Sequence, residues 1–133
     1  MYKVILIIGL GNIGSRHFES ILEIKNKTKI ILCELEDKKL NRLKKNLKKI
    51  NKNNHEILFK NKLIDFENKI DVAILATSTF KKKDIIKLLI QTNTVDNLII
   101  EKVAFDNIKD YLEILNITNE NKIKTFVNFP RRE

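Results

Sequence analysis

The sequence is poor in the residues that mark several protein classes. Its 133 residues include three glycines, one proline, one cysteine and no tryptophan. So little glycine and proline excludes a collagen-like or linker-like chain. A single cysteine excludes a disulfide framework, so we expect a reducing compartment, the cytoplasm, and not secretion.

Long apolar runs are also missing. No run is longer than residues 4–8, whereas a membrane-spanning helix needs about 18 apolar residues. That run ends in glycines and no small-residue cleavage site follows it, so a buried strand is favoured over a signal peptide. We therefore expect no membrane partner.

What the chain does contain is typical of one globular domain, with 43% hydrophobic and 32% charged residues. Its 26 lysines and arginines against 17 acids give a net charge of +9, which permits an anionic partner without choosing one. The lysine-rich stretch at 38–52 is typical of a solvated helix face. We expect no nucleic-acid partner, and keep duplex binding through this stretch as a distant alternative.

Strands and helices are predicted to alternate along the whole chain. Apolar runs predict six strands, at residues 3–8, 29–33, 56–59, 72–76, 97–100 and 123–127. Apolar residues at three- and four-residue steps predict helices at 13–25 and 37–50, a helix that Ser78 or Thr79 caps, and a helix that Asp106 caps. A short helical or irregular piece is expected around 63–66. This alternation requires parallel crossovers and predicts an open, doubly wound α/β sheet of three layers.

All three glycines lie in one loop, where the first strand becomes the first helix. Gly9, Gly11 and Gly14 form a G-x-G-x-x-G pattern, which in this context is the mark of a dinucleotide-binding Rossmann domain. Gly9 allows the tight turn, Gly11 lets a diphosphate approach the backbone, and Gly14 lets the helix pack closely on the strand. The amides of Asn12 and Ile13 at the helix start would receive the phosphates. We place this Rossmann domain at residues 1–127.

An acidic residue ends the second strand. Glu34 follows Gly14 by 20 residues, about the spacing at which a carboxylate accepts hydrogen bonds from the ribose hydroxyls. This favours NAD, because the 2′-phosphate of NADP would meet a like charge. Lys38 and Lys39 are near enough to keep NADP as the alternative. The other interpretation of Glu34 is a plain solvated acid, in which case Glu36 is the replacement.

Two further strand ends lie on the same edge of the predicted sheet. Ala76, Thr77 and Thr79 follow the fourth strand, where hydroxyls can bind the nicotinamide ribose or cap the next helix. Glu101 and Lys102 follow the fifth strand. A lysine there would place an ammonium near the nicotinamide, where it could orient a substrate hydroxyl or lower its pKa for hydride removal. We count all but Lys102 among the cofactor contacts.

The remaining reactive side chains have simpler interpretations. His17 lies on the apolar stripe of the first helix, so a packed or capping histidine is favoured over a catalytic one. His55 lies in a polar turn and is expected to be exposed. Cys33 lies within a strand without a base beside it, which indicates a buried thiol. No spacing of metal ligands is present, so we predict no metal site.

Five landmarks occur in a fixed order: GLGNIGSRH at residues 9–17, Cys33-Glu34, DVAILATSTF at 71–80, Glu101-Lys102 and VNFPRR at 127–132. Over essentially the whole chain this resembles the nucleotide-binding half of the glucose-fructose oxidoreductase and inositol dehydrogenase family (Gfo/Idh/MocA). The resemblance implies NAD(P)-linked oxidation or reduction of a sugar, cyclitol or nucleotide-sugar hydroxyl. It also implies that Lys102, matching the lysine of a Glu-Lys-Pro motif, is catalytic, and that residues 77–80 line the cofactor.

The chain departs from the family pattern at three places. Val103 replaces the proline after the lysine, Ser78 replaces another proline, and Lys82 stands where a histidine is common. Family members also continue into an open-sheet domain that binds substrate and provides an acid/base residue. We therefore expect residues 128–133 to begin the connection to a substrate domain that this chain lacks. The alternative is a stand-alone, non-catalytic dinucleotide-binding module, and the uncovered last strand suggests a homo-oligomer.

Overall fold

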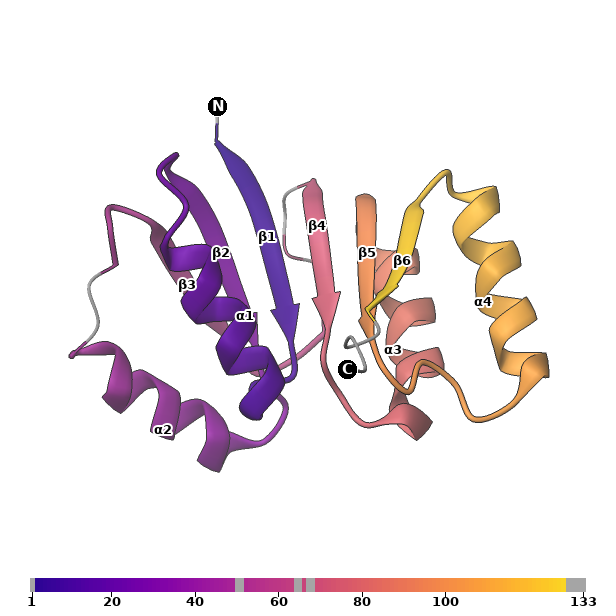
Figure 1. The fold of residues 1–133 in the computed structure, drawn as a ribbon, viewed down its shortest axis with the longest axis horizontal. Helices are drawn as coiled ribbons and strands as arrows, with labels where there is room; N and C mark the ends of the chain where they lie inside the picture. The colour runs from indigo at the N-terminus through magenta and orange to yellow at the C-terminus, as the bar shows by residue number, and fades with distance from the viewer. Residues whose placement is uncertain (1, 50–51, 64–65, 67–68, 129–133) are drawn as a thin grey trace, which may run out of the picture.

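The computed structural model describes residues 2–49, 52–63, 66 and 69–128. Within these ranges, six parallel strands form a single sheet in the order β3-β2-β1-β4-β5-β6 (Figure 1). The strands are β1 (Lys3–Ile8), β2 (Thr28–Cys33), β3 (Glu56–Lys60), β4 (Ile70–Leu75), β5 (Val95–Glu101) and β6 (Lys124–Asn128). The helices are α1 (Asn12–Leu22), α2 (Asp37–Leu47), α3 (Thr79–Thr92) and α4 (Ile108–Glu120). The predicted doubly wound parallel sheet is confirmed.

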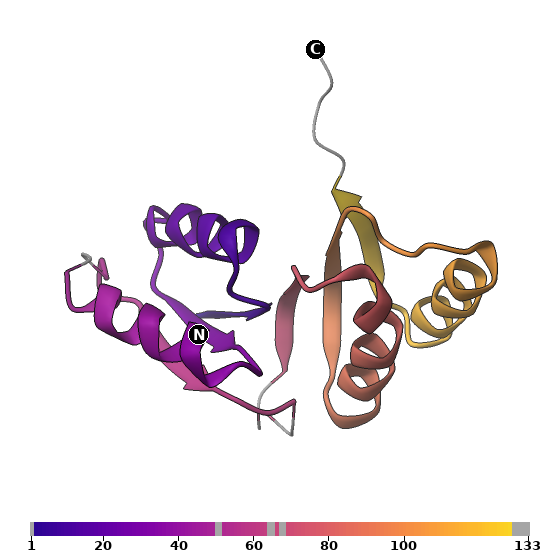
Figure 2. The same ribbon diagram turned by 90° about the horizontal axis from the view of Figure 1, so that it is seen from below.

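The sheet is covered on both faces, which is why its central strand is a continuous apolar run. Ile5 and Ile7 of β1 pack into one core together with α1 and α2. Leu6 and Ile8 pack into a second core with α3 and α4. Figure 2 shows α1 and α3 on opposite sides of the sheet. The predicted three layers are therefore present.

The first two helices end earlier than predicted, because each ends at the last residue of its buried apolar face. Leu22 and Leu47 are both 3% exposed and are the last helical residues, whereas Ile24 is 42% exposed beyond the end of α1. Helix α4 also begins differently: Asn107 and not Asp106 is its N-cap, and the Asn107 side chain accepts a hydrogen bond from the Asp110 amide at 2.8 Å. The predicted piece at 63–66 falls partly outside the described residues, but Phe66 is buried in the second core.

One face of the sheet is incompletely covered. Phe126 of β6 pairs with Ile99 of β5, so both point to the side of the sheet that carries α1. No helix of the described chain lies over β5 and β6 on that side (Figure 2), and Phe126 is 56% exposed. None of the helices in the described ranges has the length and apolarity to cross a membrane.

Strand order reverses between β1 and β4, which lie side by side although β2 and β3 separate them in sequence. The crossovers after β1 and after β4 leave the sheet on opposite sides, so their loops separate at the carboxyl edge. A crevice at such a switch point is where open α/β sheets bind ligands. The loops after β1 and β4 are therefore the place to look for a site.

Candidate functional site

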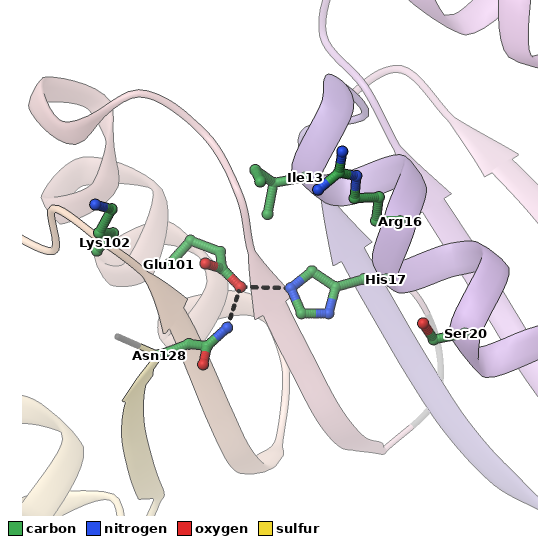
Figure 3. A pocket seen from close by; sticks show the side chains of 7 residues that line it. All are labelled: Ile13, Arg16, His17, Ser20, Glu101, Lys102 and Asn128. Atoms are coloured by element: carbon green, nitrogen blue, oxygen red, sulfur yellow. Dashed lines mark hydrogen bonds and ion pairs between the residues drawn. The ribbon is translucent and has the colours of Figure 1, made fainter. Parts of the chain in front are cut away.

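Two of the cavities at the carboxyl edge of the sheet are lined by predicted site residues from more than one strand end. The first, which we call the loop cavity, has a volume of about 260 Å³ and is lined by residues that include Gly9, Gly11, Glu34, Ala76 and Thr77. The second, the histidine cavity, has a volume of about 320 Å³ and is lined by Ile13, Arg16, His17, Ser20, Glu101, Lys102 and Asn128 (Figure 3). Most of the predicted site residues line one or the other.

The three glycines of the first loop meet different surroundings. Gly9 has a φ of +91°, and a Cβ there would lie 2.9 Å from the backbone of Ala76. A Cβ on Gly14 would lie 1.8 Å from the Gly9 carbonyl oxygen, because α1 begins directly against the turn. A Cβ on Gly11 would meet nothing within 4 Å. Close packing thus requires Gly9 and Gly14, whereas Gly11 borders space that this chain does not fill.

The start of α1 is open to an anion. Gly11 is the N-cap residue and has no side chain to bond the first amides, and the described first turn contains no acidic residue. Within the described residues, no side chain of the N-cap or the first turn therefore compensates the partial positive charge of the helix terminus at Asn12 and Ile13. Beside the gap at Gly11, this arrangement suits a phosphate group.

Glu34 organises the same loop. Its side chain is buried, with the residue 7% exposed, and accepts hydrogen bonds from the Leu10 and Glu36 amides, each at 2.9 Å. The interpretation of Glu34 as a solvated acid is therefore wrong. Each carboxylate oxygen retains acceptor capacity for a ribose hydroxyl. Glu36, the predicted replacement, is instead exposed and bonded to Lys39 at 3.0 Å, a contact that lowers the pKa of Glu36.

The loop after β4 carries an unsatisfied hydroxyl. The Oγ1 atom of Thr77 is buried and has no hydrogen-bond partner in the described part of the chain. A buried hydroxyl without a partner costs about 1–3 kcal/mol, so this atom calls for a ligand group in the loop cavity. Ser78 is the N-cap residue of α3, yet its hydroxyl makes no capping bond. The side chain of Thr79 lies outside the described residues.

The histidine cavity is built around a carboxylate. Nε2 of His17 lies 2.5 Å from Oε1 of Glu101, and the Asn128 amide donates to the same oxygen at 2.9 Å (Figure 3). The predicted position of His17 on the apolar stripe is wrong, because Phe18 and Ile21 form the buried stripe of α1 and the half-buried His17 projects beside it into the cavity. These contacts join α1 to the ends of β5 and β6.

Two cations, Arg16 and Lys102, line this cavity without forming an ion pair in the described residues. Lys102 is exposed, and its side chain points away from the His17–Glu101 pair (Figure 3). In the described residues, neither Lys102 nor Arg16 has an ion-pair partner. The peptide bond between Lys102 and Val103 is cis. Lys102 thus lies at the rim of a cavity, a position from which it could reach a bound substrate. Its catalytic role stays a prediction.

A buried lysine behind this rim was missed at the sequence level. Lys82 is 1% exposed, and its amine donates to the carbonyl oxygens of Glu101 and, at 2.8 Å, Val103. Burial lowers its pKa from the ordinary value. The available signal was its position on α3, three and four residues before Ile85 and Ile86, which places it on the buried stripe.

Two other sequence predictions are decided by burial. Cys33 is fully buried, as predicted, and this burial raises the pKa of its thiol to about 12. His55 is 6% exposed, so its predicted exposure is wrong. Its Nδ1 accepts from the Thr28 amide at 3.0 Å and its Nε2 donates to the Leu22 carbonyl at 3.2 Å, which ties the end of α1 to the start of β2. The described residues contain no cluster of potential metal ligands.

Comparison with known proteins gives a consistent result. A family model named GFO_IDH_MocA and described as an oxidoreductase family, NAD-binding Rossmann fold, matches residues 3–129. No curated protein matches the chain in sequence. Among solved structures, a Gfo/Idh/MocA family oxidoreductase from Vibrio cholerae is 13% identical with a TM-score of 0.77, and the match covers 96% of this chain and 38% of that one.

Two other solved structures resemble the chain to a similar degree. The WlbA dehydrogenase from Chromobacterium violaceum, in complex with NADH and UDP-GlcNAcA, is 15% identical with a TM-score of 0.75, covering 96% of this chain and 35% of that one. Apo scyllo-inositol dehydrogenase from Lactobacillus casei is 18% identical with a TM-score of 0.71, covering 96% and 36%. The chain thus spans about a third of the length of these proteins.

Proposed function

We propose, from the premise that this chain belongs to the Gfo/Idh/MocA oxidoreductase family through its NAD-binding Rossmann domain, that it binds NAD(H) across the loop cavity. We further propose that it is the nucleotide-binding part of a dehydrogenase acting on a hydroxyl of a sugar, cyclitol or nucleotide sugar. The observation that carries the binding proposal is the open space at Gly11, which lies in the same cavity as the Thr77 hydroxyl. In the described part of the chain that hydroxyl has no hydrogen-bond partner.

The residues present fit such a cofactor. The amides of Asn12 and Ile13 would hold the diphosphate, and Glu34 would accept from the adenosine ribose hydroxyls. Ala76 and Thr77 would line the middle of the cofactor, and Glu101 would border its nicotinamide end. When bound, NAD supplies the hydride acceptor or donor. What the chain adds is orientation of that group at the edge of the histidine cavity.

Lys102 would act on the substrate hydroxyl. From the rim of the histidine cavity, its ammonium can donate a hydrogen bond to the hydroxyl oxygen and stabilise the negative charge that develops there as the C–H bond breaks. Glu101 is held by His17 and Asn128 and is therefore less available for this task. The UDP-GlcNAcA complex and the inositol dehydrogenase among the similar structures support a polyhydroxylated small molecule as substrate.

NAD is the proposed cofactor and NADP the alternative. The buried Glu34 carboxylate would repel a 2′-phosphate. A neighbouring cavity of about 430 Å³, lined in part by Gly11, Lys39 and Arg42, supplies the cations that NADP would need. The proposal also includes a cytoplasmic setting and a homo-oligomer formed through the uncovered β6 side, where Phe126 is exposed.

Titration of the chain with NADH, followed by calorimetry, tests the proposal. Gly11→Val fills the gap that the diphosphate would enter, so we expect a loss of affinity of at least about 100-fold, or about 2.7 kcal/mol. The matched control is Asn41→Val, which adds the same side chain at an exposed position of α2 outside both cavities. Equal affinity in a folded Gly11→Val protein would refute the placement. NADH binding without turnover of any polyol by a complete protein would favour the non-catalytic module.

A further inference from the structure

Lys82 occupies a position that packing alone would give to an apolar residue. It lies on the stripe of α3 that also carries Ile85, Ile86 and Leu89, all buried in the second core. Burying an ammonium costs free energy unless it is hydrogen-bonded or paired. In the described chain, no carboxylate lies within ion-pair distance of this amine, so its hydrogen bonds must offset that cost.

Those hydrogen bonds go to one short segment. The Lys82 amine donates to the carbonyl oxygens of Glu101 and Val103, the residues on either side of Lys102. A single donor group thus holds the backbone both before and after Lys102. Lys102 is exposed and has no ion-pair partner of its own in the described residues. No ion pair of its side chain therefore holds it in place within that part of the chain.

The position of Lys82 also links two parts of the site. Helix α3 begins directly after the loop of Ala76, Thr77 and Ser78 that lines the loop cavity. The segment that Lys82 bonds lines the histidine cavity (Figure 3). An amine on the first turn and a half of α3 therefore connects the wall of one cavity to the rim of the other.

We propose that Lys82 is a positioning residue: its buried amine fixes the backbone at Glu101–Val103 and thereby sets where the Lys102 ammonium stands at the rim of the histidine cavity. The connection of Lys102 to substrate rests on the proposed function. The restraint on the backbone does not depend on it.

Backbone relaxation measured by ¹⁵N NMR on the full 133-residue chain tests the restraint. Lys82→Met keeps the apolar stem and removes the donor. We expect the order parameters of the Lys102 and Val103 amides to fall from about 0.85 to below about 0.6, with those of residues 9–15 unchanged. The Cε signal of Lys102 should shift as well, because its side chain would sample new surroundings.

Lys83→Met is the matched control. Lys83 is the next residue of α3 and bonds Asp110 and Glu113 of α4 at 3.1 Å each, so its loss perturbs the same helix without touching the Lys102 segment. We expect its Lys102 and Val103 amides to stay rigid. Unchanged order parameters in a folded Lys82→Met protein, or an equal loss in Lys83→Met, would overturn the proposal.

A measurement on the unaltered protein covers the case in which Lys82→Met fails to fold. The Nζ protons of Lys82 should exchange slowly and show scalar coupling across the hydrogen bonds to the carbonyl carbons of Glu101 and Val103. Rapidly exchanging protons without such coupling would overturn the proposal. An NADH titration separates the two claims: absence of binding in the unaltered chain refutes the proposed function and leaves the relaxation result as the test of Lys82.

Discussion

The loop cavity and the histidine cavity are built from different parts of the chain. The loop cavity depends on main-chain shape: a glycine turn, a helix start without a side-chain cap, and the Glu34 carboxylate bonded to backbone amides of the loops after β1 and β2. The histidine cavity depends on side chains that meet from α1, β5 and β6, with His17 and Glu101 separated by 84 residues. A main-chain site is visible as a local pattern, whereas a side-chain site forms only when distant strands come together.

The largest expected effect tests the main-chain shape of the loop cavity. In Gly14→Ala the new Cβ would overlap the Gly9 carbonyl oxygen at 1.8 Å, so we expect a loss of more than about 4 kcal/mol in the free energy of unfolding, or no folded protein. Gly11→Ala is the control, because its Cβ meets only open space and should cost no more than about 1 kcal/mol. Urea unfolding measures both, and the reverse ranking would contradict the structure.

The next effect concerns Glu34. Glu34→Ala leaves the Leu10 and Glu36 amides without their acceptor, so we expect about 2 kcal/mol of lost stability. It should also weaken NADH more than NADPH, because the ribose acceptor and the charge that repels a 2′-phosphate disappear together. Glu36→Ala removes only an exposed ion pair and should change neither property much. An unaltered NADH-to-NADPH affinity ratio in Glu34→Ala would contradict the assigned contact.

A pH-dependent effect concerns Cys33, the buried residue before Glu34. Burial raises the pKa of the Cys33 thiol from 9.0 to about 12, so between these values the unfolded chain loses its thiol proton first. The stability contributed by the neutral thiol is therefore fully present below pH 9 and is lost as the pH rises toward 12. Urea unfolding of wild type and Cys33→Ala should diverge across this window. Rapid native labelling of the thiol at pH 8 would contradict the burial of Cys33.

The smallest expected effect concerns the rim of the other cavity. Lys102→Ala removes an exposed ammonium that no described residue pairs with, so NADH affinity should change by less than about twofold. In a complete enzyme the same change should remove turnover, because the ammonium acts on charge that develops only in the transition state. A large loss of NADH affinity would assign Lys102 to cofactor binding. It would contradict the division of roles in which Gly11 borders the cofactor and Lys102 acts on the substrate.

The local patterns predicted the elements of the fold well and its polar contacts unevenly. The six strands and four helices of the described residues follow from apolar runs and periodicities that neighbouring residues encode. Cys33 was placed correctly because a strand covered on both faces buries every residue. His55 and His17 were misjudged, because their partners, the Leu22 carbonyl and the Glu101 carboxylate, lie 33 and 84 residues away. The N-cap of α4 was misplaced by one residue, because Asp106 and Asn107 are adjacent and both side chains can accept a hydrogen bond from the first turn of a helix.

The amino-acid sequence determines on its own which residues form strands, that the loop after β1 consists largely of glycine, and that an acidic residue, Glu34, follows β2. Each of these is a short-range consequence of side-chain volume and backbone freedom. The folded chain alone decides that Gly11 borders a gap, that Thr77 lacks a partner in the described residues, and that Lys82 reaches the carbonyls beside Lys102. Those facts depend on which strand ends become neighbours, and β4 reaches β1 only after the chain has passed through β2 and β3.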